Sequence, residues 1–109
     1  MAAIELMEDM SLDQMQDNAA KATLLLKSMA NETRLMILCQ LLNGEKSVGE
    51  MHENIPLSQS ALSQHLAVLR RERLVSTSRV AQSVFYSLAS EEVRAIIETL
   101  YQLYCAPED

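Results

Sequence analysis

The residues of this 109-residue sequence best suited to redox or metal chemistry are two cysteines and two histidines. Catalysis by a Cys39 nucleophile would require a base within hydrogen-bond reach and an oxyanion site. Cys39 instead lies in an apolar run with no histidine nearby in the sequence. The residues therefore argue against an enzyme.

A metal site also lacks ligands. Tetrahedral zinc takes four Cys, His or carboxylate ligands, and the Cys and His residues are only Cys39, Cys105, His52 and His65. We expect no bound metal and no cofactor. Two interpretations of the cysteines stay open on the residues alone. They are a redox pair, or Cys39 is a small core side chain and Cys105 an incidental tail residue.

The stretch "SQSALSQHLAVLRRERLV" at residues 58–75 has chemistry suited to DNA. It predicts a helix over 59–71 with Ser58 as the N-cap, and its leucines, spaced i, i+4, i+7, face the core. The opposite face carries hydroxyl and amide groups. Glutamine pairs with both edge atoms of adenine, and serine donates or accepts at several bases. The expected base-reading residues are Gln59, Ser60, Ser63 and Gln64.

Phosphate contacts are expected from the arginines and from the helix start. Arg70, Arg71 and Arg73 suit phosphates, which position a protein without reading sequence, and the amides behind Ser58 can also meet a phosphate. Arg79, near the tip of a predicted hairpin, suits a minor groove or a phosphate. The alternative is a solvated amphipathic face and a solvent-exposed arginine. His65 points to the core edge, where we expect a packed, hydrogen-bonded side chain.

The charge of the sequence is unevenly distributed. The net charge is −6, and residues 1–20 hold five acidic residues with no Lys or Arg. Residues 56–90, in contrast, hold four arginines against Glu72 alone. Affinity for phosphates depends on where positive groups lie, so an acidic total is compatible with DNA binding. An acidic dimeric adaptor that uses the same fold as a scaffold is the competing function.

The hydrophobic pattern predicts which elements position these residues. Helices are expected from about residue 13, over 32–42, over about 48–54, over 59–71 and after Ser90, with a β-hairpin in "RLVSTSRV" and "SVFYSL". The order α-α-α-α-β-β-α is mainly α with a small β-hairpin wing, a dimeric winged helix-turn-helix. Because the hairpin tip contains no glycine, we expect a loop longer than two residues.

Residues 1–12 are expected to be a flexible arm, 13–105 the DNA-binding and dimerisation domain, and 106–109 a tail. The N-terminus does not resemble a signal peptide, and no apolar run approaches a membrane span of about 20 residues. We therefore expect a cytoplasmic protein with no membrane contact. The apolar stripes of the first and last helices exceed what one small core can cover, which predicts a homodimer on an inverted-repeat operator of double-stranded DNA.

Four segments in this order carry a family resemblance: "LKSMANETRLMILCQLL", "SVGEM", "LSQSALSQHLAVLRRERLV" and "VFYSL". Over about residues 20–105 the chain resembles the ArsR/SmtB family of dimeric bacterial repressors. The resemblance implies that Gln59, Ser60, Ser63 and Gln64 read bases. One departure is Arg73, where such proteins often have a glycine, and it makes the turn into the hairpin harder to close.

The metal sites of the family are missing from this sequence. The segment "SVGEMHEN" has no cysteine, and "SEEVRAIIETLYQLYC" has no histidine. The remaining cysteines resemble the two-cysteine branch of the family, which responds to reactive sulfur or oxidants. This resemblance implies a thiol switch at Cys39 and Cys105 and a reversible sulfur bridge between them. The alternatives are a metal-responsive repressor and a non-sensing regulator that activates by displacing a nucleoid silencer.

Overall fold

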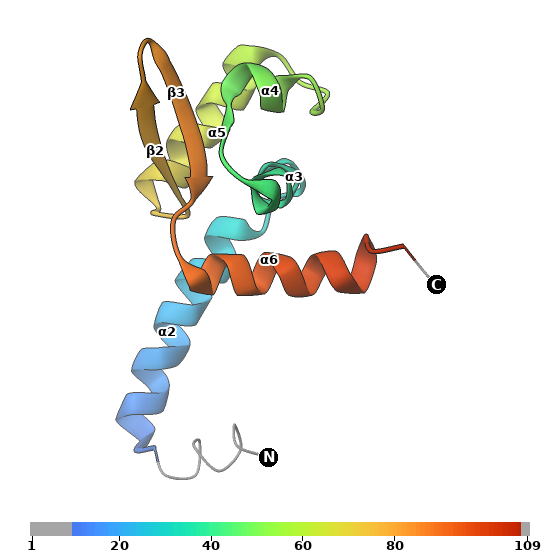
Figure 1. The fold of residues 1–109 in the computed structure, drawn as a ribbon. Coiled ribbons are helices and arrows are strands. Elements are labelled where there is room, and N and C mark those ends of the chain that lie inside the picture. Colours follow the sequence, from blue (N-terminus) through green and yellow to red (C-terminus); the bar gives the residue numbers. More distant parts are fainter. Residues whose placement is uncertain (1–9, 108–109) are drawn as a thin grey trace.

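The first helix, α2 (Leu12–Met29), extends away from the rest of the molecule in the computed structural model, which describes residues 10–107 (Figure 1). Its start is fixed by a capping box, in which the Ser11 Oγ accepts from the Gln14 N–H and the Gln14 side chain accepts from the Ser11 N–H. The helix therefore begins one residue before the predicted start. Residues 1–9 of the predicted arm and 108–109 of the predicted tail lie outside the described residues.

The second helix, α3 (Glu32–Gln40), is capped by the Asn31 side chain and continues into a 3-10 turn, η1 (Leu41–Asn43). Because residues 32–42 are apolar nearly all round, the sequence predicts that this helix is the central buried one. That prediction is wrong for one face. Ile37 and Leu38 are fully buried, whereas Met36 is 38% exposed and Cys39 is half-buried. The helix lies at the edge of the core, where another helix covers only part of it.

Two helices joined by a turn form the helix-turn-helix. They are α4 (Val48–His52), which begins with a capping box between Ser47 and Glu50, and α5 (Gln59–Arg71), which is capped by Ser58. Hydrogen bonding to Ser47 holds the pKa of the Glu50 carboxyl below its usual range. Helix α4 ends two residues before the predicted end, because the Asn54 N–H bonds to the Met51 carbonyl and tightens the chain into a turn.

The wing is a hairpin of β2 (Val75–Val80) and β3 (Ser83–Leu88), and a short strand, β1 (Lys46–Ser47), pairs with the other edge of β3. All pairs are antiparallel. Strand β1 was not predicted, because two residues are too few to show an alternating pattern. Val80 pairs with Ser83, so the prediction of a longer loop is wrong. Ala81 adopts the positive φ, 56°, that this two-residue turn requires.

The junction between α5 and β2 is a Schellman motif. The Leu74 N–H donates to the Leu69 carbonyl at 2.8 Å, and the Arg73 N–H donates to the Arg70 carbonyl at 3.0 Å. Leu69 and Leu74 are both fully buried, which supplies the hydrophobic contact of the motif. Arg73 takes the left-handed position with φ 65°, where glycine is the usual residue. The turn into the hairpin therefore closes with a strained residue at its centre.

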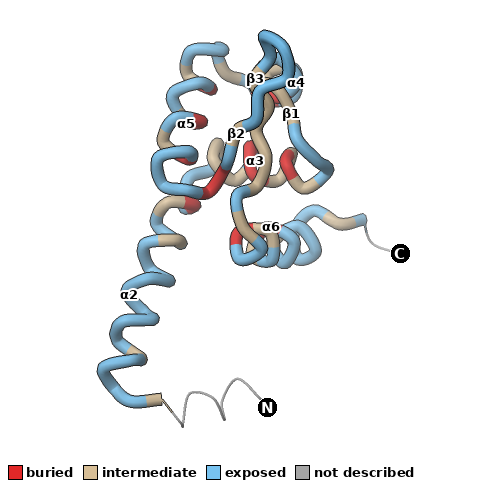
Figure 2. The backbone as a smooth tube through the Cα atoms, turned by 60° about the vertical axis from the view of Figure 1, so that its left-hand side comes forward, coloured by how far each residue is buried: buried red, intermediate tan, exposed pale blue. Residues whose placement is uncertain are grey.

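The last helix, α6 (Glu91–Tyr104), crosses beneath α3 and packs against it (Figure 1). The Arg94 guanidinium donates to the Leu42 carbonyl at 3.4 Å and ties α6 to η1. Buried residues gather where α3, α5, the hairpin and α6 meet, whereas α2 is exposed along nearly its whole length (Figure 2). The core consists of Met29, Ile37, Leu38, Leu41, Met51, Ile55, Leu62, Leu66, Leu69, Leu74, Val75, Val93 and Ile97.

Candidate nucleic-acid interface and thiol pair

The outer face of α5 presents mainly polar side chains. Its leucines are fully buried, and this packing turns the opposite side of the helix outward. The Ser58 Oγ accepts from the Ala61 N–H at 3.1 Å, so this hydroxyl is engaged in the cap. The backbone N–H groups of the first helical turn, next to Ser58, therefore remain the groups that can meet a phosphate at this end of the helix. The exposed predicted residues on this face are Gln59, Ser60, Ser63, Gln64, Arg70 and Arg71.

The arginines converge on a cleft between α5 and the wing. Arg70 at the end of α5 and Arg79 on β2 line a cleft of about 210 Å³, together with Thr77, Ser78 and Val84. Among residues 10–107 the only ion pair joins Arg94 to Glu98, so neither cleft arginine is paired with a carboxylate of this range. Two guanidinium groups and the Thr77 hydroxyl around one cleft are donors suited to a phosphate.

Thr77 and Ser78 were missed by the sequence analysis. They sit in a strand whose serines and threonines indicate only β-structure, and their place beside Arg70 depends on how β2 folds back onto α5. The Ser78 hydroxyl donates to a Glu45 carboxylate oxygen at 3.3 Å. The Thr77 hydroxyl is therefore the more available of the two.

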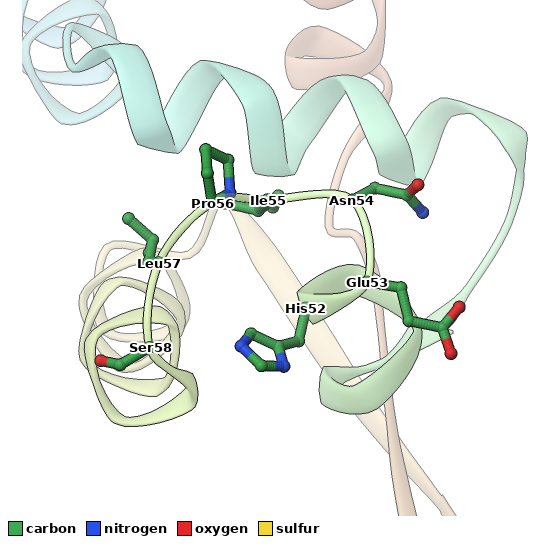
Figure 3. Close-up of a pocket in the computed structure, with 7 residues that line it drawn as sticks. All are labelled: His52, Glu53, Asn54, Ile55, Pro56, Leu57 and Ser58. Carbon is green, nitrogen blue, oxygen red and sulfur yellow. The ribbon is translucent and has the colours of Figure 1, made fainter.

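The turn between α4 and α5 borders a larger hollow of about 690 Å³, which is wide open to solvent and is lined by residues 52–58 (Figure 3). The side chains spread away from one another. The His52 ring lies on the inner side of the loop, whereas Glu53 and Asn54 point to the other side (Figure 3). This hollow results from the shape of the turn and gathers no set of ligating groups.

His65 is half-buried at the core edge, in agreement with the helical spacing. No hydrogen bond within residues 10–107 involves its ring, so the predicted hydrogen bond is not formed with this part of the chain. Nor does any group of three or more His, Cys, Asp or Glu side chains in this range gather closely enough to hold a metal ion. No helix in the described range is long and apolar enough to cross a membrane.

The two cysteines are brought together by the packing of α6 on α3. Both are free thiols, and both line a cavity of about 260 Å³ with Leu35, Leu100 and Tyr104. Burial raises the pKa of the Cys39 thiol, and a negative charge on Cys105 raises it further. Cys105 is exposed, and its N–H donates to the Tyr101 carbonyl at 2.8 Å, which fixes it at the end of α6.

The sequence analysis also did not predict the apolar walls of this cavity. The spacing of the residues indicates which of them share a helix face. Leu35 and Cys39 are four residues apart on one helix, and Leu100 and Tyr104 are four residues apart on the other. The sequence predicts that Leu35 lies in the central buried helix, and that Leu100 belongs to the apolar stripe of the last helix that forms the dimer. Only the packing of α6 across α3 shows that the two faces enclose a common space.

The fold is that of a winged helix-turn-helix DNA-binding transcriptional regulator. Three features define this class here: the two helices of the helix-turn-helix, the polar outer face of α5 and the hairpin. The family described as "Bacterial regulatory protein, arsR family" matches residues 31–77. The chain belongs to this arsR family, in the branch of HlyU and BigR.

Curated relatives and solved structures agree on this placement. The chain is 62% identical over 96 residues to the transcriptional activator HlyU of Vibrio cholerae serotype O1, covering 88% of this chain and 89% of the relative. It is 42% identical over 101 residues to the biofilm growth-associated repressor of Agrobacterium fabrum, covering 93% and 86%. The structure of reduced HlyU from Vibrio cholerae aligns with a TM-score of 0.83 and 61% identity, over 87% of this chain and all of that one. These relatives are named as regulators and not as enzymes.

Proposed function

We propose that this protein is a sequence-specific, dimeric, cytoplasmic regulator whose DNA affinity is lowered when Cys39 and Cys105 are joined by a reversible sulfur bridge. The observation that carries the proposal is the cavity between α3 and α6, which both thiols line. In this proposal the thiol pair reacts with the signal, and the response is a change in DNA binding, which is the activity of the family.

Sequence reading is assigned to the exposed face of α5. Gln59, Ser60, Ser63 and Gln64 enter the major groove, where glutamine pairs with adenine. Arg70, Arg71 and Arg79 bind phosphates, and the cleft that holds Arg70 and Arg79 seats a backbone oxygen between α5 and the wing. The four positions read sequence, and the arginines set position and affinity.

Dimerisation is assigned to α2 and α6. Leu24 and Leu26 on α2 are 68% and 55% exposed, and Leu103 on α6 is 69% exposed, a degree of apolar exposure that a second copy of the chain would cover. A two-fold dimer places two α5 helices about one turn of DNA apart, which calls for an inverted-repeat operator.

The switch acts through the helix that carries both Cys105 and part of the dimer face. A disulfide needs Cα atoms within about 7 Å, and each inserted sulfur extends the reach by ~2 Å. Both thiols line one cavity of about 260 Å³, and this shared space supports a polysulfide bridge made from persulfides. A bridge that holds α6 against α3 alters the spacing of the two α5 helices and lowers DNA affinity, with a coupling of about 1–3 kcal/mol.

The bridge itself is tested by intact-protein mass spectrometry after persulfide treatment of the wild type, Cys39→Ser and Cys105→Ser. We expect the wild type to gain sulfur within one protomer and to lose it on reduction. Each serine variant should instead carry an open persulfide. Wild-type protein that gains only open persulfides, with no bridge, contradicts the proposal.

A further inference from the structure

A reactive pair outside the DNA interface and the thiol cavity lies at the end of the 3-10 turn η1, where Asn43 is followed by Gly44. Both residues are exposed, and no hydrogen bond within residues 10–107 involves the Asn43 side chain. Gly44 has φ 122°, and a Cβ at this position would have nothing within 4 Å. The Asn43 amide therefore lies beside an unhindered backbone nitrogen and is free to rotate toward it.

The backbone around Gly44 is held weakly. The Gly44 N–H donates to the Leu41 carbonyl at 3.2 Å, and this is the hydrogen bond that fixes the nitrogen. A single 3-10 turn has poorer hydrogen-bond geometry than an α-helix, so the turn opens at little cost. The other asparagines of the sequence precede Ala19, Glu32 and Ile55, whose side chains obstruct the same approach.

We propose that Asn43 is a modification site at which the protein deamidates through a cyclic succinimide, and that the isoaspartate so formed loosens β1 from the wing. The Gly44 nitrogen attacks Cγ of Asn43, and the new N–Cγ bond closes the succinimide ring. The side-chain nitrogen leaves as ammonia and takes the proton that the Gly44 nitrogen gives up. Water then opens the ring. Hydrolysis at Cγ gives aspartate, and hydrolysis at the main-chain carbonyl gives isoaspartate, whose main chain runs through Cβ and Cγ.

The place of Asn43 in the fold gives this reaction a structural effect. On one side of it, the Leu42 carbonyl accepts from the Arg94 guanidinium at 3.4 Å. On the other side, the Glu45 carboxylate accepts from the Ser78 hydroxyl at 3.3 Å, and β1 follows at once. Isoaspartate adds a methylene to the main chain between these two contacts. Because β1 pairs with β3 over only two residues, we expect the added atom to disturb its register.

The first test measures how far the fold protects this bond, using reduced full-length protein at mildly alkaline pH, both folded and in guanidinium chloride. Peptide mass mapping follows deamidation at Asn43. We expect the folded rate to lie within about tenfold of the unfolded rate, because only one hydrogen bond of the Gly44 nitrogen must open. The matched control is Glu32→Gly, which places a glycine after Asn31, whose side chain accepts from the Arg34 N–H at 3.1 Å and caps α3. The fold should slow deamidation at Asn31 at least about tenfold more than at Asn43.

The second test measures hydrogen exchange in the isoaspartate form, separated from the unmodified protein by ion-exchange chromatography. Backbone amides of residues 45–48 should exchange at least about fivefold faster than in the unmodified protein, because β1 opens more often. Asn43→Asp carries the same charge without the added methylene and should exchange like the unmodified protein. Asn43→Gln, incubated in the same way, should gain no isoaspartate at this position.

A folded rate further below the unfolded rate than about tenfold, or equal protection of Asn43 and Asn31, would overturn the modification site. Equal exchange in the isoaspartate form and the unmodified protein would overturn its effect on β1. Neither measurement involves DNA or the thiols, so the outcome is independent of the proposed function.

Discussion

The two thiols differ in environment at the scale of the single residue. Cys39 is half-buried among leucines, and burial raises the pKa of its thiol; a thiolate at Cys105 raises that pKa further. Cys105 is exposed at the end of α6. Because thiolate is the nucleophile, the raised pKa of Cys39 predicts a slow reaction of this thiol at neutral pH.

The raised pKa of Cys39 predicts a pH dependence. A raised pKa leaves less thiolate at a given pH, so the alkylation rate at Cys39 in Cys105→Ser should reach half its maximum at a higher pH in the folded protein than in the same variant unfolded in denaturant. Rates of iodoacetamide labelling between neutral and strongly alkaline pH measure both profiles. Coincident profiles would contradict the account of the Cys39 environment.

Substitutions of the residues expected to read bases and of those expected to bind phosphates should differ in their effect on DNA sequence specificity. Gln59→Ala or Gln64→Ala should lose about 1–3 kcal/mol of operator binding and relax the sequence preference, because a base contact is removed. Arg79→Ala should weaken operator and random DNA alike and flatten the salt dependence, because a phosphate contact is removed. Titrations of both DNAs at several salt concentrations measure these effects. An unchanged specificity ratio in both glutamine variants would show that α5 is not the reading helix.

At the scale of the elements, strong local signals predicted the fold. Leucine spacing and the Ser58 cap placed α5, and the order of the long helices and of the hairpin agrees with the structure. The errors concern features set by tertiary contacts. Strand β1 exists because β3 offers it an edge, α3 has an exposed face because α6 covers it only partly, and the wing closes through a strained Ala81.

The strained turn after α5 predicts a stabilising substitution. Arg73→Gly should raise the free energy of unfolding by about 0.5–1 kcal/mol, because glycine adopts the left-handed conformation without the Cβ clash. The matched control Arg73→Ala removes the same charge but keeps the strain, and it should bring no such gain. Denaturant unfolding measures both. Equal effects of the two variants would mean that charge, not backbone strain, governs the position.

At the scale of the whole molecule, α2 projects from the body (Figure 2). Its exposed residues include the apolar side chains of Leu24 and Leu26. The thiol cavity also belongs to this scale. The sequence identified both cysteines, but only the crossing of α6 over α3 supplies the walls that surround them. The residues expected to read bases could be placed together from the sequence because one helix, α5, carries them all, whereas the cavity is built from two segments far apart in the chain.

The dimer is tested by placing a charge on the exposed face of α2. Leu26→Glu should shift the protein to monomer at micromolar concentration, because a carboxylate would be buried in the interface. Val80→Glu is the matched control, since Val80 is similarly exposed but lies on the wing. Sedimentation velocity distinguishes the two. A monomeric wild type would contradict the assigned interface.

The central claim is that the sulfur bridge controls DNA affinity, and one titration tests it most directly. Operator DNA is titrated with reduced, persulfide-treated and re-reduced wild-type protein at fixed salt, with Cys39→Ser as the control. We predict that treatment weakens operator binding by about 5–150-fold in the wild type and that reduction restores it, because the bridge favours a dimer geometry that fits the operator poorly. The serine variant should keep its affinity throughout. Unchanged affinity in wild-type protein whose bridge is confirmed by mass would contradict the account.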